Sequence, residues 1–203
     1  MLGKTHFMGG VLTGIYLCEL HGITLSPLVG GLLGGIAALI PDIDEPHSLI
    51  SNQNLGELSK LSNVKVGNKR PLKFMGLARY LSWFKPLKPV SNVVNKTVGH
   101  RSYTHTIWFC GIVGLIGSLL TQITGTTSLT LWEIIAGGAL SHLILDGITK
   151  AGVFPLLPLK FRIKGPFTTG KALDIIGPYL LLGLSIYVLI HGHANILPGK
   201  IKI

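Results

Sequence analysis

Long apolar runs alternate with short polar junctions along most of this chain. Five such runs can be marked, and each is close to the roughly 20 residues that an α-helix needs to cross the hydrocarbon core of a bilayer. They cover residues 5–20, 23–40, 104–123, 131–148 and 172–190. The pattern predicts an all-α fold, an integral-membrane helical bundle of about five apolar helices. The first run is the shortest, so a re-entrant or shallow helix is an alternative there.

Glycine recurs inside the apolar runs. Residues 30–35 hold four glycines, and Gly137 and Gly138 are adjacent in the fourth run. In a membrane, small residues allow two helix backbones to approach closely. The glycines therefore predict helices that pack tightly against one another.

A polar and basic stretch, residues 45–103, separates the second run from the third. Its part at 72–84 is compatible with a helix that lies flat at the membrane interface, with aromatic side chains in lipid and cations at the headgroups. A structured cytoplasmic loop is the alternative. We expect one domain over residues 1–203, with 45–103 as a cytoplasmic loop inserted between helices.

Composition supports a membrane location. Mean hydropathy is +0.53 and 13% of the residues are charged, whereas soluble domains have about a quarter. Ten of the 18 Lys and Arg residues fall in 60–101 and five more in 150–171. Because basic loops stay on the cytoplasmic side, these stretches and the N-terminus are predicted to face the cytoplasm. Cys18 and Cys110 lie inside apolar runs and are predicted to be core residues.

Seven side chains that can bind a metal ion lie at the ends of apolar runs, all on the predicted cytoplasmic side. They are His6, Asp42, Asp44, His100, His105, His142 and Asp146. Acidic residues at such positions are costly and usually functional. His142 and Asp146 are four residues apart, which places both on one face of a helix. Pro41 ends the second run, so an irregular turn is expected to present the two acids that follow it.

Mixed imidazole and carboxylate ligands favour Zn²⁺, Mn²⁺ or Fe²⁺ over Ca²⁺ and Mg²⁺. Seven ligands suit two ions, an arrangement that promotes displacement at phosphorus. Arg101 can clamp a phosphate, and with Asp44 it is the candidate catalytic residue. Some of these residues also have a structural interpretation. His142 can be a helix–helix hydrogen-bond partner. Arg101, and Lys150 one turn beyond Asp146, can anchor to headgroups.

Further polar residues lie near the apolar runs. His47 is either an extra ligand or a surface residue. Asp174 opens the fifth run, where an acid complements the helix dipole, so a capping role is expected. His191 falls on the opposite side of the membrane in the predicted topology and is excluded from the site.

Four motifs in series then resemble a known family. They are Thr5-His6, the stretch 39–48 (LIPDIDEPHS), the stretch 99–106 (GHRSYTHT), and 141–146 (SHLILD) with 149–153. Together they resemble the YdjM-type family of inner-membrane proteins. This resemblance implies that the protein is a metal-dependent hydrolase. Glu45 departs from the pattern, since many relatives carry a histidine there.

The resemblance implies a distant relation to the zinc-dependent phospholipase C and single-strand nuclease superfamily, an all-helical fold that binds a cluster of zinc ions. Position by position, it supports six of the seven residues as ligands and places Asp44 in the same motif. Two or more zinc ions are therefore expected, with manganese or iron as alternatives.

The leading hypothesis is a metal-dependent phosphoesterase of the inner membrane that acts on a lipid or lipid-linked phosphate at the cytoplasmic interface. A membrane-tethered nuclease would use the basic stretch to bind nucleic acid, but topology and anionic lipids already account for that charge. A metal-binding transporter is a further alternative, although transporters usually hold their ions near the bilayer midplane. The last alternative is a structural membrane protein whose polar residues form hydrogen bonds between its helices.

Overall fold

The computed structural model describes residues 2–21, 25–45, 48, 87–98, 103–123 and 128–195. It divides into two compact units, one made of Met1–Pro41 with Arg101–Ile203 and the other of Asp42–His100. The interfacial helix predicted at 72–84 lies outside the described residues, as do His47, His100 and Arg101. The prediction of one domain over the whole chain stays a prediction.

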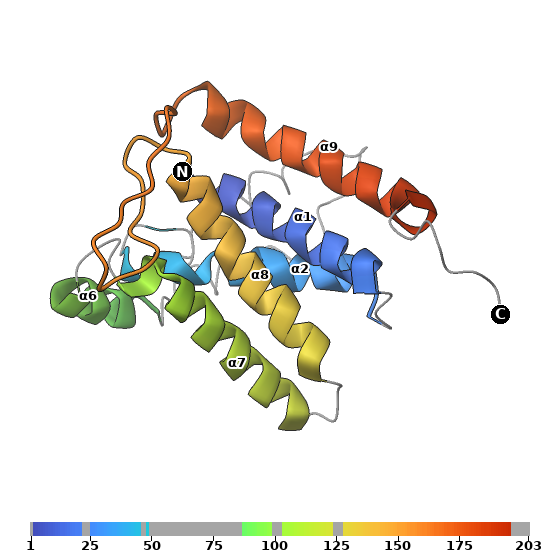
Figure 1. Cartoon of the computed structure of the whole chain (residues 1–203), viewed down its shortest axis with the longest axis horizontal. Helices are drawn as coiled ribbons and strands as arrows, with labels where there is room; N and C mark the ends of the chain where they lie inside the picture. Colours follow the sequence, from blue (N-terminus) through green and yellow to red (C-terminus); the bar gives the residue numbers. More distant parts are fainter. Residues whose placement is uncertain are drawn as a thin grey trace, which may run out of the picture. The chain divides into compact units, whose positions relative to one another are not determined.

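The first unit consists of helices and one extended connection (Figure 1). Its helices are α1 (Gly3–His21), α2 (Pro27–Ala37), the 3-10 helix η2 (Tyr103–His105), α7 (Ile107–Ile123), α8 (Ser128–Gly147) and α9 (Ala172–Asn195). The second unit holds α6 (Leu87–Val98), and the 3-10 helix η1 (Ile40–Asp44) crosses the boundary between the units. The described residues contain two isolated β-bridges and no β-strand, so the all-α prediction is confirmed for them.

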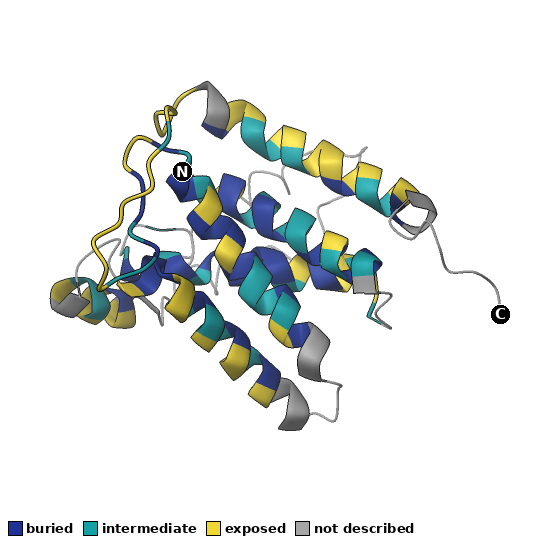
Figure 2. Cartoon of the chain, viewed as in Figure 1, coloured by how far each residue is buried: buried dark blue, intermediate teal, exposed yellow. Residues whose placement is uncertain are grey.

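Exposed residues line the outside of several helices (Figure 2), and many of them are large and apolar. On α7 the exposed positions recur every three or four residues and form one stripe, made of Trp108, Ile112, Leu115, Ile116 and Leu119. Soluble proteins rarely expose contiguous apolar surface of this extent. The outward face of the bundle is therefore suited to lipid.

Two helical stretches of the described chain are long and apolar enough to cross a membrane, Pro27–Asp44 and Asp174–Gly192. Ile107–Leu119 is a shorter apolar helix. The expectation of five membrane-length helices is thus met by length and composition at two of the five runs. For the other three runs the structure has helices, and their crossing of the membrane stays a prediction.

Helices α1, α2 and α8 meet at a glycine crossing, which we define as Gly10, Gly34 and Gly138. α1 packs against both α2 and α8, and α2 also packs against α8. A Cβ atom added to Gly138 would lie 2.9 Å from the Cα of Gly34, and one added to Gly10 would lie 2.6 Å from the Cβ of Ala38. No side chain fits there, which confirms the tight packing that the glycines predict.

The interior of the bundle is unusual because many of its best buried side chains are polar. Ile134 and Val153 are fully buried, but so are His6, His105, His142 and Asp146 of the same unit. Cys18 and Cys110 are buried and free of disulfides, as predicted. Since burying a polar group is costly unless it is paired or ligated, these side chains mark a site.

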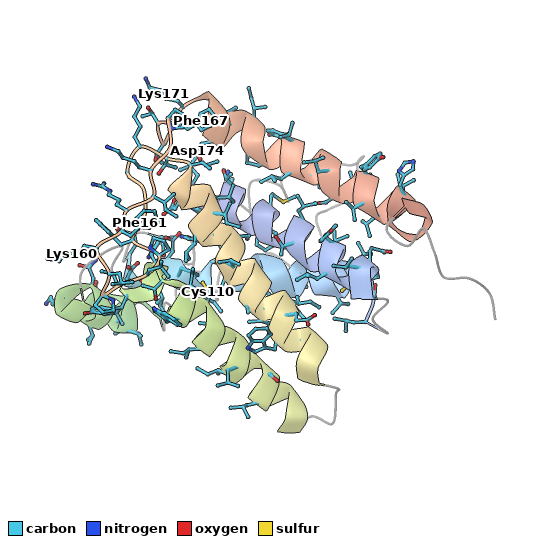
Figure 3. The ribbon with its side chains drawn as sticks, in the orientation of Figure 1. Cys110, Lys160, Phe161, Phe167, Lys171 and Asp174 are labelled. Carbon is cyan, nitrogen blue, oxygen red and sulfur yellow. The ribbon has the colours of Figure 1, made fainter. Side chains whose placement is uncertain are left out.

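The connection from α8 to α9, residues 148–171, is extended and held by its own backbone. Val153 and Ile163 exchange two N–H···O hydrogen bonds of 2.9 Å each, and Lys150 donates to the carbonyl of Phe167. Basic and aromatic side chains of this connection, among them Lys160 and Phe161, project outward (Figure 3). The segment thus combines an apolar surface with positive charge.

Asp174 joins the N-terminal ends of α1 and α9. Its carboxylate accepts hydrogen bonds from the N–H of Leu2 at 3.0 Å, from the hydroxyl of Thr5 at 3.3 Å and from the N–H of Gly170. Asp174 lies in the first turn of α9, as predicted, and its hydrogen bonds also reach the residue that precedes α1. The start of α1, which carries His6, is therefore fixed against α9.

Candidate metal centre

Four of the predicted ligands lie together in the first unit. His6 comes from the first turns of α1, His105 ends η2, and His142 and Asp146 lie on the last turns of α8. All four side chains are at most 1% exposed. We call these four residues the His/Asp cluster.

The carboxylate of Asp146 is central to the His/Asp cluster. Its Oδ1 lies 3.4 Å from Nε2 of His6, and its Oδ2 lies 3.7 and 3.8 Å from Nε2 of His105 and His142. The Nε2 atoms of His105 and His142 are 3.2 Å apart. With metal–ligand bonds of about 2.1 Å, two ligand atoms of a tetrahedral Zn²⁺ site are about 3.4 Å apart. The spacing of the ligand atoms of His105, His142 and Asp146 fits a shared transition-metal ion, and Nε2 of His6 lies beside the same carboxylate.

Hydrogen bonding fixes the orientation of His142. Its Nδ1 lies 2.7 Å from the carbonyl oxygen of Ala38. A carbonyl only accepts, so Nδ1 carries the hydrogen and the neutral ring presents a lone pair at Nε2, toward Asp146. Ligand histidines typically donate their other ring N–H to such a carbonyl. His142 is therefore the helix–helix partner of the structural interpretation, and its ring is oriented as that of a metal ligand would be.

His6 has one ring nitrogen without a partner. Its ring stacks on that of His142, with centroids 3.7 Å apart and planes inclined by 17°. Nε2 faces Asp146, whereas the buried Nδ1 has no hydrogen-bond partner in the described part of the chain. Leaving a buried polar atom unsatisfied costs about 1–3 kcal/mol. A cation bound at Nδ1 would offset this cost, whereas a cation bound at Nε2, the atom that faces Asp146, would not.

The position of Asp146 in its helix also favours a cation. It lies one residue before the end of α8, where the helix dipole is negative and disfavours an acid. Thr149 fixes this end, because its N–H and hydroxyl donate to the carbonyl of Asp146 at 3.0 and 2.7 Å. Burial adds a desolvation cost for the carboxylate. Positive charge among the imidazoles would offset both effects.

The glycine crossing lies one helical turn from the His/Asp cluster. Gly10 follows His6 by four residues, and Gly138 precedes His142 by four. Since four residues are about one turn, close contact at the glycines brings the two histidines to the same depth. Each of these two glycines lies four residues from a histidine in the sequence. Contact between the glycines thus brings together two predicted ligands that are far apart in the chain.

The remaining predicted ligands do not belong to the His/Asp cluster. Asp42 and Asp44 lie in η1 and belong to the second unit, where the carbonyl of Asp44 accepts a 2.7 Å hydrogen bond from Nδ2 of Asn95. The irregular turn expected after Pro41 is wrong, because this stretch forms a 3-10 helix. Asp44 is fully buried and Asp42 half-buried. Both remain predicted ligands, as does His100, and Lys150 is exposed.

Sequence reasoning missed the groups that hold the ligands in place. Nδ1 of His105 lies 3.0 Å from the hydroxyl of Thr104, and Thr149 and the carbonyl of Ala38 act as described above. A signal for one of them was available, because a threonine directly precedes both His6 and His105. The carbonyl of Ala38 had no such signal, since any residue can supply it.

The fold and the site define a helical protein with membrane-length apolar helices and a buried histidine and aspartate cluster that can hold a metal ion. Comparison with known families agrees with this class. The chain belongs to the YdjM inner membrane protein family, whose model matches residues 1–197. The resemblance to this family seen in the four motifs is confirmed, and the family's name supports an inner-membrane location. The hydrolase activity that the resemblance implies stays a prediction.

The chain is also similar to a curated protein of Bacillus subtilis (strain 168), "Uncharacterized protein YvsG". The two are 30% identical over 200 residues, which cover 95% of this chain and 98% of the relative. No solved structure matches. The expected relation to the phospholipase C fold stays a prediction.

Proposed function

We propose that this protein is a membrane-bound, metal-dependent phosphoesterase. The proposal rests on one observation: Asp146, buried at the unfavourable end of its helix, faces the Nε2 atoms of three buried histidines. Such a set suits Zn²⁺, with Mn²⁺ or Fe²⁺ as alternatives. Asp42, Asp44 and His100 are proposed to complete a second ion site. Asp42 and Asp44 follow Ala38, which contacts His142, by only four and six residues along the chain.

A pair of ions bound there supplies Lewis-acid stabilisation of the charge that develops on phosphate oxygens. Arg101 is proposed to clamp the same phosphate through two parallel hydrogen bonds, and Asp44 to accept a proton from the attacking water. In the overall reaction the water oxygen forms a bond to phosphorus. The ester P–O bond breaks, and the leaving alcohol oxygen takes up the proton.

The substrate is proposed to be a lipid or lipid-linked phosphate. The apolar outer faces of α7 and α9 and the family's inner-membrane location support this class. The basic content of 60–101 and 150–171 supports a site on the cytoplasmic side. A headgroup phosphate at that depth meets the ends of α1 and α8, whereas a soluble metabolite would have no need of a membrane enzyme.

The test combines metal analysis with hydrolysis. Detergent-purified protein, prepared without chelators, is assayed for bound transition metal and for phosphate or alcohol release from phospholipids and lipid phosphates with added Zn²⁺ or Mn²⁺. We expect bound metal and hydrolysis, and we expect His142→Ala to lose both. His191→Ala is the matched control, because His191 is exposed on α9 and stacks only on Tyr187 among its ring contacts.

Two outcomes would contradict the proposal. Hydrolysis that is unchanged in His142→Ala would remove the His/Asp cluster from the chemistry. Metal flux across proteoliposomes without hydrolysis of any phosphate tested would instead favour the transporter.

A further inference from the structure

The connection between α8 and α9 carries an unbroken run of exposed residues, 158–164. From 159 to 164 apolar and basic side chains alternate without exception, in the order LKFRIK. Successive side chains of an extended segment point to opposite faces. We call residues 159–164 the amphipathic run. Its apolar face consists of Leu159, Phe161 and Ile163, and its basic face consists of Lys160, Arg162 and Lys164.

Contacts on both sides of the amphipathic run agree with this alternation. On the apolar face, a Cβ added to Gly147 would lie 3.4 Å from Cγ2 of Ile163, so this face is turned toward the end of α8. On the basic face, the guanidinium of Arg162 lies 5.5 Å from the ring centre of Phe154 and donates to the carbonyl of Ala151. The apolar and the basic side chains therefore diverge.

Backbone hydrogen bonds hold the connection at one end of the bundle. The carbonyl of Pro155 accepts a 2.9 Å hydrogen bond from the N–H of Ile107, the first residue of α7. The N–H of Gly170 donates to the carboxylate of Asp174 in the first turn of α9. Because α9 is long and apolar enough to cross a membrane, a crossing α9 leaves the connection at the membrane surface.

The connection is basic along its whole length. Residues 147–173 contain five Lys and Arg residues and no Asp or Glu, and all five basic residues are exposed. Lys160 and Lys171 extend outward from different ends of the connection (Figure 3). The acids that flank this segment, Asp146 and Asp174, are buried. The exposed surface of the connection therefore attracts anions.

We propose that the amphipathic run is a binding surface for anionic phospholipid. Leu159 and Phe161 enter the interfacial layer of the bilayer, and the basic face binds lipid phosphates. The two apolar side chains are 64% and 58% exposed, so lipid offers them the burial that the bundle does not. Basic side chains beside an apolar surface extend their charged ends to the headgroups. This inference is independent of the proposed metal site and of any hydrolysis.

A lipid surface fits the amphipathic run better than a nucleic acid does. Both would supply phosphates to the basic face. A nucleic acid would offer bases that stack on an aromatic ring, which uses Phe161 and leaves Leu159 in water. The interfacial layer of a bilayer accommodates aromatic and aliphatic side chains together, and it lies where a crossing α9 leaves the connection.

The experiment measures lipid contact at Phe161. Full-length protein with Phe161→Trp is placed in nanodiscs that contain equal amounts of phosphatidylcholine and phosphatidylglycerol, and two preparations differ only in which lipid carries bromine in its acyl chains. Bromine quenches nearby tryptophan, and subtraction of the unmodified protein removes the signal of its three tryptophans. We expect stronger quenching by the brominated phosphatidylglycerol, with a relative association constant of about tenfold or more, since each basic residue near an anionic leaflet contributes about fivefold.

A second tryptophan position is the control for contact with lipid in general. Tyr187 is exposed on α9, 13 residues after Asp174 and therefore about 20 Å along the helix. In Tyr187→Trp the two brominated lipids should quench about equally, because no headgroup is selected at that depth. A preference for phosphatidylglycerol that is equally large at both positions would contradict a binding surface at the amphipathic run.

Charge variants test the basic face. In the Phe161→Trp protein, Lys160→Gln with Lys164→Gln should lower the preference for phosphatidylglycerol by about tenfold or more, as should raising the salt from about 0.1 to about 1 M, which shortens the screening length from about 10 to about 3 Å. Lys160→Arg with Lys164→Arg is the matched control, because it keeps both charges and should keep the preference.

Four results would overturn the proposal. Quenching of Phe161→Trp by neither lipid would place the run away from the bilayer, and equal quenching by both would remove the headgroup selection. An equal loss of preference in the Gln and Arg pairs would show that charge is not the cause. A change of tryptophan emission on adding a single-stranded oligonucleotide, without lipid preference, would assign the surface to nucleic acid instead.

Discussion

Asp146 and Asp174 are both buried acids near helix ends, yet their surroundings are opposite. Asp174 lies in the first turn of α9 and accepts hydrogen bonds from two backbone N–H groups and a hydroxyl. Asp146 lies at the end of α8 and faces imidazole nitrogens. The helix dipoles stabilise the first carboxylate and oppose the second.

This difference separates a structural acid from a candidate metal ligand. The charge of Asp174 is neutralised by the positive ends of α1 and α9, so it needs no cation. Asp146 lies instead at the negative end of its helix, and the groups that face it are imidazoles, which also bind transition metals. Thr5 and His6, adjacent on α1, connect the two: the first donates to Asp174 and the second faces Asp146.

The largest effect is expected for Asp146→Asn. The substitution preserves size but removes the charge and replaces one carboxylate oxygen with the NH₂ donor of an amide. Metal affinity should fall by about 100-fold or more, since even outer partners of ligands cost 10- to 100-fold. Titration calorimetry and elemental analysis measure it. Asp174→Asn should retain its metal. An equal loss of metal in well-folded Asp146→Asn and Asp174→Asn would contradict the difference proposed between the two acids.

A shift of α8 should weaken the site while both acids remain. In Gly138→Ala the new methyl group would lie 2.9 Å from the Cα of Gly34, so α8 must move away from α2. We expect a loss of about 1–3 kcal/mol in the free energy of unfolding, together with weaker metal binding. Thermal unfolding in detergent and metal titration report these. Gly183→Ala, in open space on α9, is the control, and it should lower neither the stability nor the metal affinity.

For Asp174→Asn the expected effect is on stability alone. The amide presents a donor to groups that themselves donate, which leaves at least one hydrogen bond unmade. The free energy of unfolding should fall by about 1–3 kcal/mol, with metal content near that of the unmodified protein. Chemical denaturation in detergent with parallel metal analysis tests both. Unchanged stability would show that the two helix ends do not depend on this carboxylate.

The smallest effect is expected for Thr5→Val. It removes one hydroxyl hydrogen bond of 3.3 Å to Asp174 while preserving shape, so about 0.5–1.5 kcal/mol should be lost. Metal affinity should change little, because the peptide N–H of Leu2 still holds the start of α1. A large loss of metal would mean that Asp174 positions His6 more directly than its distance from the cluster suggests.

Local sequence pattern predicted the features that depend on local chemistry. The i,i+4 spacing identified His142 and Asp146 as neighbours, and complementarity with the helix dipole placed Asp174 in a first turn. The all-helical fold and the glycine contacts followed from hydropathy and from small residues in apolar runs. These features depend on helical periodicity, which one sequence contains.

Features that depend on three-dimensional packing were not predicted. The stacking of His6 on His142 and the hydrogen bond from His142 to Ala38 arise where helices distant in sequence cross. The 3-10 helix at Ile40–Asp44 replaced an expected irregular turn, because proline at this position is compatible with a tighter helix as well as with a break. Backbone carbonyls as partners have no residue type by which to recognise them.

The distribution of the four ligands along the chain has a consequence for biogenesis. His6 leaves the ribosome first, but His142 and Asp146 emerge only after most of the protein has been synthesised. The histidine of the N-terminal helix is therefore made before the other residues of the His/Asp cluster exist. The metal ion proposed for this cluster would bind only after α8 has been made, and a nascent chain arrested before that helix should not acquire it.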